Sequence, residues 1–329
     1  MTLIHASPLL ETKNLTKHFR VGGLFSSRKL HAVDQLNLSI NEGEILAIVG
    51  ESGSGKSTIA RLLAKIYQPT AGEVYFLGRK LSEIRNRAEL RRYRGDVPMI
   101  LQDPFASLNP VHTIGYVLER GLILHRPELS ALEREHEAIR VLEQVGLTPA
   151  RQVLTKYPHE MSGGQRQRVG FAQALSYKPR LVLADEPVSM LDVSIRIGLL
   201  NLMTRLCEEE GISFLYITHD LASARYIAHR IMVMYAGHAV EFGQTDDILH
   251  NPAHPYTKLL LAAVPDPKAA ITISAAEAGE PPRVIDPGIG CRFRNRCSLV
   301  QAECAQIAPS VTTIAPSHAV ACPVVAAIR

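Results

Sequence analysis

A glycine-rich segment of this 329-residue chain, Gly50 to Ser57, fits the pattern G-x-x-x-x-G-K-[ST]. It directly follows the apolar run Ile45 to Val49 and opens a helical pattern from Thr58 to Ile66. Glycine lets the backbone wrap closely around a phosphate, and the N–H groups at a helix N-terminus then face the anion. The segment therefore predicts a phosphate-binding loop between a buried strand and a helix.

Two side chains of this loop have specific expected roles. Lys56 is placed to reach the β- and γ-phosphates of a nucleotide, and Ser57 is placed to ligate Mg²⁺. The residues that we expect at the phosphates are Gly50, Ser52, Gly53, Ser54, Gly55, Lys56, Ser57 and Thr58.

A second motif supports nucleotide chemistry. The apolar run Leu181 to Ala184 ends in two adjacent carboxylates, Asp185 and Glu186. A buried strand that ends in two charges requires a reason for them, although alone it could be a solvated acidic turn. Beside a phosphate loop, Asp185 is expected to hold Mg²⁺ and Glu186 to act as general base on the attacking water.

The pattern along the chain predicts an α/β fold. Two helices are predicted. Ser130 and Glu133 form a capping box before a helix that stops at Gly146, and a second helix runs from about Asp192 to Gly211. Four apolar runs without alternation are typical of strands covered on both faces: Ile45 to Val49, Leu181 to Ala184, Phe214 to Ile217 and Ile231 to Met234.

The chain divides into two expected domains. Residues 1–251 form the nucleotide-binding part, with an inserted helical subdomain at about 91–178, where no clear strand is predicted. Residues 252–329 form a C-terminal region that begins rich in Pro, Gly and Ala and carries four cysteines near its end.

Composition excludes several classes of protein. At 46% hydrophobic and 21% charged residues, the chain can bury a core and is not of the disordered class. The net charge of +4 is spread along the sequence, so it gives no reason to expect nucleic acid. The apolar runs are far shorter than a bilayer span and no signal peptide is evident, so we expect a soluble intracellular or peripheral protein.

The segment Met161 to Arg168 resembles the signature motif of ATP-binding cassette (ABC) ATPases, with Met161 where Leu is commoner. The other motifs resemble that family in order: Gln102 the Q-loop glutamine, Ser189 to Asp192 the D-loop, and His219 the switch histidine. Phe19 resembles the aromatic residue that stacks on adenine, although Phe25 lies nearby. The resemblance implies a P-loop ABC ATPase with a RecA-like core, an antiparallel β subdomain and an inserted helical subdomain, plus the small cysteine-bearing region.

The resemblance also implies how the site works. In this family two cassettes pair head to tail, and ATP lies between the P-loop of one and the signature motif of the other, here Ser162, Gly163, Gly164 and Gln165. The catalytic residues are then Glu186, His219 and Gln102, and the Mg²⁺ ligands are Ser57, Gln102 and Asp185.

Three further segments resemble the dipeptide/oligopeptide/nickel importer subfamily, and within it the second of two ATPase subunits, the F-type: Gln102 to Pro110, Ala184 to Ser189 and Asn251 to Thr257. This implies an energy-coupling ATPase of a bacterial peptide importer, peripheral on the cytoplasmic face of the inner membrane. Its partners would be two permease subunits, a second ABC ATPase in a heterodimer, and through the complex an extracytoplasmic binding protein, with no nucleic acid. The alternatives are an oligosaccharide or nickel importer, a soluble ABC ATPase acting on nucleic acid or ribosomes, and a redox or iron-sensing regulator.

The cysteines at Cys291, Cys297, Cys304 and Cys322 provide enough thiolates for one Zn²⁺ or one [4Fe–4S] cluster, and their spacing alone does not choose between metals and free thiols. Arg292, Arg294 and Arg296 alternate through the segment and could compensate the charge of a four-thiolate cluster. The tail is similar to subfamily tails that hold [4Fe–4S], and this resemblance favours the cluster, with Zn²⁺ as the alternative.

Overall fold

The computed structural model describes residues 7–22, 27–103, 108–263 and 284–328. Two compact units divide the chain. Unit 1 comprises Met1–Ile40, Ile45–Leu81 and Tyr216–Arg329, and unit 2 comprises Asn41–Glu44 and Ser82–Leu215.

Unit 1 contains a four-stranded antiparallel sheet, which only the family resemblance predicted. Its strands lie in the order β2 (Lys29–Ile40), β1 (Leu10–Arg20), β4 (Ala71–Phe76) and β5 (Arg79–Lys80). The buried hydroxyl of Thr12 on β1 satisfies its hydrogen bond by donating to the carbonyl of Leu36 on β2, at 2.9 Å.

A second group of paired strands in unit 1 carries the nucleotide loop after β3 and the C-terminal tail at β12 and β11. Its strands lie in the order β3 (Ile45–Val49), β9 (Arg230–Tyr235), β10 (His238–Gln244), β12 (His318–Val320) and β11 (Thr312–Ala315). β3 and β9 are parallel, and the other pairs are antiparallel. The helices of unit 1 are α1 (Lys56–Leu63), α9 (Leu221–Ile227), α10 (Thr245–His250), α11 (Pro255–Ala262) and α12 (Pro323–Ile328), and short 3₁₀ turns span Leu81–Glu83, Arg294–Arg296 and Ala302–Ala305.

A buried carboxylate joins the tail to this sheet. Glu241 on β10, 2% exposed, accepts hydrogen bonds from the backbone N–H groups of Ala253 and His254 at 2.7 and 2.9 Å. Its carboxylate also lies 2.6 Å from Nε2 of the buried His318 on β12. A buried charge needs such partners, so this residue ties β10, the start of α11 and the tail together.

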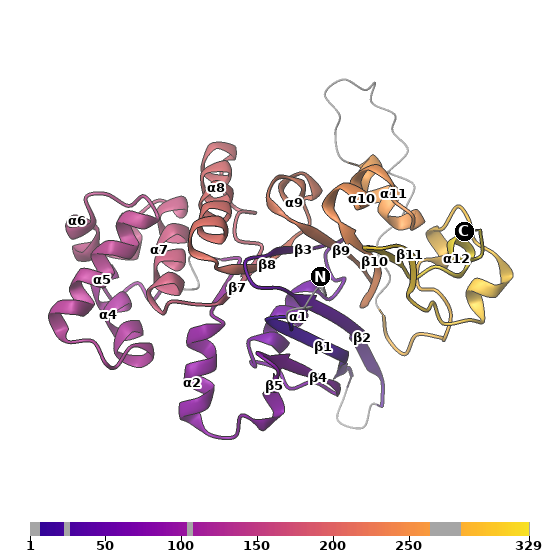
Figure 1. The fold of residues 1–329 in the computed structure, drawn as a ribbon, viewed down its shortest axis with the longest axis horizontal. Coiled ribbons are helices and arrows are strands. Elements are labelled where there is room, and N and C mark those ends of the chain that lie inside the picture. Colours follow the sequence, from indigo (N-terminus) through magenta and orange to yellow (C-terminus); the bar gives the residue numbers. More distant parts are fainter. Residues whose placement is uncertain (1–6, 23–26, 104–107, 264–283, 329) are drawn as a thin grey trace, which may run out of the picture. The chain divides into compact units, whose positions relative to one another are not determined.

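Unit 2 combines a parallel pair of strands with helices. β6 (Met99–Ile100) pairs parallel with β7 (Leu181–Asp185). The helices α4, α5, α6 and α7 pack against one another as one group, drawn in magenta and rose in Figure 1. The helices of the unit are α2 (Arg87–Asp96), α4 (Ile114–His125), α5 (Ala131–Gln144), α6 (Ala150–Thr155), α7 (Gly163–Ser176) and α8 (Val193–Glu210), with a 3₁₀ turn at Pro158–Glu160.

The local predictions agree with the structure. The four apolar runs are β3, β7, β8 (Ser213–Thr218) and β9, each within two residues of its predicted bounds. The capping box of Ser130 and Glu133 begins α5, and Gly211 in the left-handed conformation ends α8. One element differs from the prediction, because the stretch 91–178 contains the two-residue strand β6, which is too short to give a sequence pattern.

None of the helices in the described ranges is both long enough and apolar enough to cross a lipid bilayer.

Candidate functional site

The phosphate loop of unit 1 begins where the buried strand β3 ends. Gly50 has φ +156°, and a Cβ there would lie 2.2 Å from the carbonyl oxygen of Met234 on β9. Gly55 has φ +104°, and a Cβ there would lie 2.1 Å from the carbonyl oxygen of Ala32 on β2. Both contacts are far inside van der Waals distance, so only glycine lets the loop pass between these two strands.

Lys56 is the first residue of α1 and is 5% exposed. Its Nζ donates to the carbonyl oxygens of Gly50 and Glu51, at 2.7 and 2.9 Å. The ammonium group is therefore held inside the curve of the loop, where anionic oxygens can replace the carbonyls as acceptors.

The other loop side chains also suit an anion. The hydroxyl of Ser54 is buried and has no hydrogen-bond partner among the described residues. Ser57 and Thr58 lie half-buried in the first turn of α1, and Ser52 and Gly53 are exposed. A phosphate at the helix N-terminus would supply acceptors for such donors.

Phe19 and His219 also belong to unit 1. Phe19 is half-buried on β1, with Tyr67 edge-on at 5.4 Å between ring centroids and the ammonium of Lys17 at 5.0 Å from its ring. His219 is exposed in the turn between β8 and α9, directly before Asp220, which caps α9. The nearby Phe25 lies outside the described residues.

In unit 2, Gln102 and Glu186 contact each other, with Nε2 of the amide donating to Oε2 of the carboxylate at 2.9 Å. Glu186 has a left-handed backbone, φ +48°, directly after the buried Asp185 that ends β7. A non-glycine residue in this conformation is strained by about 1–3 kcal/mol, and such strain concentrates at functional sites. Residues 104–107, within the predicted Gln102 to Pro110 segment, lie outside the described residues.

The signature segment forms a well-capped helix start. Oγ of Ser162 accepts from the backbone N–H of Gln165 at 3.3 Å, and Oε1 of Gln165 accepts from the N–H of Ser162 at 3.1 Å. Gly164 packs against Ile195 of α8, because a Cβ there would lie 2.8 Å from its Cγ2. The N-terminus of α7, with Gly163, is thereby fixed, and the N–H groups at a helix end of this kind can face an anion.

The tail brings its four cysteines into one neighbourhood. Cys291, Cys304 and Cys322 are buried and Cys297 is half-buried, and the N–H of Cys291 donates to the carbonyl of Cys304 at 2.7 Å. Burial raises the pKa of the Cys291 and Cys297 thiols, and the neighbouring tail thiols raise it further. Such sulfurs are poor thiolates unless a metal ion compensates their charge.

Two of the tail arginines pair with carboxylates, whereas we expected them to compensate the charge of a four-thiolate cluster. Arg292 pairs with Asp34 on β2, and Arg296 pairs with Glu51 in the phosphate loop. Their charges are therefore used by the cassette, and sequence reasoning missed Glu51 and Asp34 because nothing local in the sequence marks them as partners of the tail.

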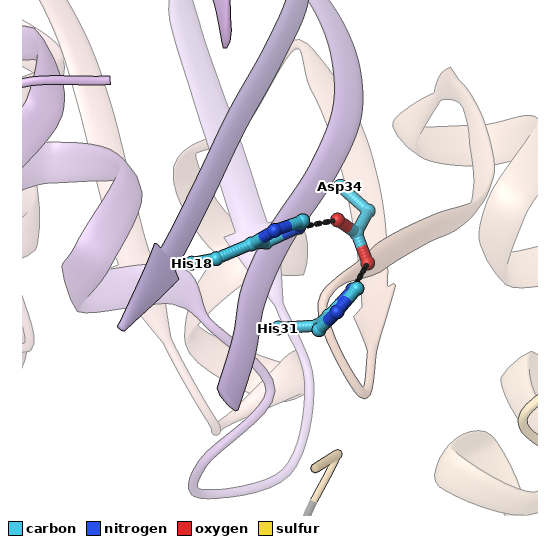
Figure 2. A group of neighbouring side chains, drawn as sticks. All are labelled: His18, His31 and Asp34. Carbon is cyan, nitrogen blue, oxygen red and sulfur yellow. Dashed lines mark hydrogen bonds and ion pairs between the residues drawn. The ribbon is translucent and has the colours of Figure 1, made fainter. Parts of the chain in front are cut away.

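Figure 2 shows His18, His31 and Asp34, the one group of three or more metal-type side chains within 4.8 Å of one another among the described residues. The carboxylate of Asp34 is hydrogen-bonded to both imidazole rings and to the guanidinium of Arg292. Burial raises the pKa of Asp34, but hydrogen bonds from His18, Arg292 and His31 outweigh it and lower the pKa to about 2. Its carboxylate is thus already satisfied, so the group is a network that joins β1, β2 and the tail.

Four features are now in place: a phosphate loop, a strand that ends in two carboxylates, a glutamine that donates to the second carboxylate, and a capped helix start with the sequence Ser-Gly-Gly-Gln. Together they define an ATPase of the ABC class. The sequence matches the ABC transporter family over residues 33–189 and the C-terminal region of oligopeptide/dipeptide transporters over residues 240–304.

Solved structures and relatives agree with this class. A dimeric ATP-binding cassette in a post-hydrolysis state with ADP and phosphate aligns with a TM-score of 0.64 and 30% identity, covering 72% of this chain and 98% of that one. The oligopeptide transport ATP-binding proteins OppF of Salmonella typhimurium and Escherichia coli are each 44% identical over 95% of both chains. A putative oligopeptide transport ATP-binding protein of Bacillus subtilis is 42% identical over 96% of this chain and 95% of its own. The chain therefore belongs to the oligopeptide-transport ATP-binding family of ABC transporters.

Proposed function

We propose that this protein hydrolyses ATP as the energy-coupling subunit of a bacterial ABC importer of peptides. The observation that carries the proposal is the joint match of the cassette and of the oligopeptide-type C-terminal region in one chain. The relatives that align with 95% of the chain are named for oligopeptide transport, which favours peptides over the oligosaccharide and nickel alternatives.

The chemistry follows from the residues of each unit. Glu186 accepts the proton of the attacking water as general base, and Gln102 positions its carboxylate through the 2.9 Å hydrogen bond. Lys56 and the loop N–H groups hold the β- and γ-phosphates, His219 contacts the γ-phosphate, and Phe19 stacks on adenine. Ser57, Asp185 and Gln102 would hold Mg²⁺, which neutralises phosphate charge; a hydroxyl, a carboxylate and an amide oxygen are the hard donors this ion prefers.

A second cassette completes the nucleotide site. The capped N-terminus of α7, with Ser162, Gly163, Gly164 and Gln165, is a helix end suited to the γ-phosphate bound by the partner's loop. Near the D-loop, Met190, Val193 and Ile197 are 60%, 69% and 46% exposed, which supports an apolar contact between cassettes. We propose a heterodimer with a different ATPase, because the sequence motifs resemble those of the second of two ATPase subunits.

Two permease subunits receive the work of this dimer. Exposed apolar side chains lie around the Gln102 segment of unit 2, since Leu101, Val111 and Tyr116 are 39%, 70% and 44% exposed. This surface supports a contact with the cytoplasmic ends of the permeases. In the proposed complex the protein lies peripherally on the inner membrane, and an extracytoplasmic binding protein is part of the same assembly.

The four tail cysteines hold a [4Fe–4S] cluster in this proposal. The tail holds four cysteines, of which Cys291, Cys304 and Cys322 are buried and Cys297 is half-buried. Four thiolates are the number that such a cluster requires, and the resemblance of the tail to the subfamily supports this choice over Zn²⁺.

Reconstitution tests the function. The chain is purified with its genomic neighbours, a second ATPase and two permeases, in vesicles with the binding protein. We expect oligopeptide to stimulate ATP hydrolysis and to accumulate inside, and the chain to sediment with membranes only when the permeases are present. Stimulation by an oligosaccharide or by Ni²⁺, and none by peptide, would replace the cargo and leave the ATPase assignment in place.

A further inference from the structure

A bidentate ion pair connects the phosphate loop to the C-terminal tail. Nη1 of Arg296 lies 2.8 Å from Oε2 of Glu51, and Nη2 lies 2.9 Å from Oε1. The side chains are 11% and 24% exposed, so the pair is largely removed from water. Parallel N–H···O bonds of this kind are among the stronger polar contacts in proteins.

Glu51 is linked in turn to the phosphate-binding lysine. The carbonyl oxygen of Glu51 accepts Nζ of Lys56 at 2.9 Å, and its N–H donates to the hydroxyl of the buried Tyr256 at 3.0 Å. The backbone and the side chain of Glu51 are therefore both held, and a change in the side chain is passed directly to the acceptor of Lys56.

Aromatic rings hold the guanidinium of Arg296 in place. It lies 5.7 Å from the ring centroid of Tyr235 and 5.9 Å from that of Phe293, and its Nη1 donates to the Tyr235 hydroxyl at 3.4 Å. These two rings and Tyr256 pack edge-on and tilted at 4.6–5.4 Å. The side chain thus loses little further freedom when it binds the carboxylate.

A second set of hydrogen bonds also connects the tail to the phosphate loop. Arg292, also on the tail, donates to the carbonyl oxygen of Ala236 in the turn between β9 and β10. The next residue, Gly237, donates its N–H to the carbonyl of Ser54 in the loop at 2.9 Å. Two arginines of the tail therefore support the loop, one at each of two points.

The contact between Arg296 and Glu51 neutralises a negative charge in the phosphate loop. Glu51 lies in the loop that must accept a triphosphate, and an unpaired carboxylate there would repel it. We infer that Arg296 is a positioning residue for ATP binding: the tail neutralises Glu51 and holds it so that the loop and Lys56 accept the phosphates. The inference rests on ATP binding by the loop, not on the cargo or on the identity of the tail metal.

Variants of the full chain test this through ATP affinity, measured by calorimetry, and through KM and kcat of steady-state hydrolysis. We expect Arg296→Gln to weaken ATP binding about 5- to 30-fold while kcat stays within about twofold. The matched control is Arg294→Gln in the same 3₁₀ turn, since the Arg294 guanidinium donates to the Cys291 carbonyl within the tail itself, and it should leave affinity within about twofold. Arg296→Lys keeps the charge but not the bidentate geometry and should fall between them.

The double variant Glu51→Gln with Arg296→Gln separates this role from a general role in folding the tail. Removal of both charges should restore ATP affinity to within about threefold of the wild type, because the repelling carboxylate is gone. A double variant as weak as Arg296→Gln, or an Arg296→Gln protein with unchanged affinity, would overturn the inference. Loss of peptide import with ATP affinity intact would instead count against the proposed transport function alone.

Discussion

The amide of Gln102 donates to the carboxylate of Glu186 at 2.9 Å, although the two residues are 84 positions apart in the chain. Glu186 is in the left-handed conformation, so its side chain is presented at the end of β7 by a strained backbone. The contact places the proposed base beside an amide that donates to its carboxylate.

Glu186→Gln should retain ATP binding and lose most turnover. The isosteric amide preserves packing and can still contact Gln102, but it does not take up the proton of the attacking water. We expect kcat to fall about 10²- to 10⁴-fold, the usual contribution of a general base. Phosphate release measures turnover, and Glu209→Gln on the exposed face of α8 is the matched control. Near-normal hydrolysis by Glu186→Gln would remove this residue from the role of base.

Lys56→Ala should weaken nucleotide binding itself. The buried ammonium donates to loop carbonyls at 2.7 and 2.9 Å, and phosphate oxygens can take the place of these acceptors. Loss of a charged hydrogen bond predicts an affinity about 10- to 150-fold lower. Equilibrium titration with ATP checks this, with the exposed Lys258→Ala of α11 as control. An unchanged dissociation constant would contradict the assignment of the loop.

If the tail holds the proposed [4Fe–4S] cluster, removal of one of its thiols should release iron. Protein purified without oxygen should be brown and contain about four irons and four acid-labile sulfides per chain. Cys304→Ser should bleach it and loosen the tail, because ligation supplies folding free energy to a segment poor in large apolar residues. The control Cys207→Ala, at a buried thiol of α8 in the other unit, should keep the colour. Colourless wild-type protein with one zinc per chain would show that Zn²⁺ is the metal.

Acid should destabilise the protein through a buried histidine. Burial lowers the pKa of His254 to about 4, whereas an unfolded histidine titrates at about 6.5. Between those values the unfolded chain binds the extra proton, so the free energy of unfolding falls as pH falls through this window, by up to about 3 kcal/mol.

Urea unfolding at about pH 7 and about pH 5 measures this change. Nδ1 of His254 accepts the N–H of Tyr256 at the start of α11, and Asn can make the same cap without titrating. His254→Asn should therefore lose less stability than the wild type on acidification, while His238, whose pKa burial also lowers to about 4, acts equally in both proteins. Equal losses in the two proteins would exclude His254 as the source.

Elements with local sequence signals are predictable from the residues alone. The strand before Gly50, the capping box of Ser130 and Glu133 and the helix stop at Gly211 all depend on neighbours within a few residues, and each lies where it was predicted. The ABC motifs were found for the same reason, because phosphate binding and helix capping need fixed short spacings.

Contacts between residues far apart in the chain depend on the folded arrangement and are not predictable from local patterns. Glu51 and Arg296 are 245 positions apart and Asp34 and Arg292 are 258 apart, and neither pair leaves a periodic or spaced pattern in the sequence. Packing likewise determines that β12 and β11 join the sheet edge and that His318 contacts Glu241. Ion pairs of this kind form when the fold brings burial and opposite charge together, a condition that local sequence does not encode.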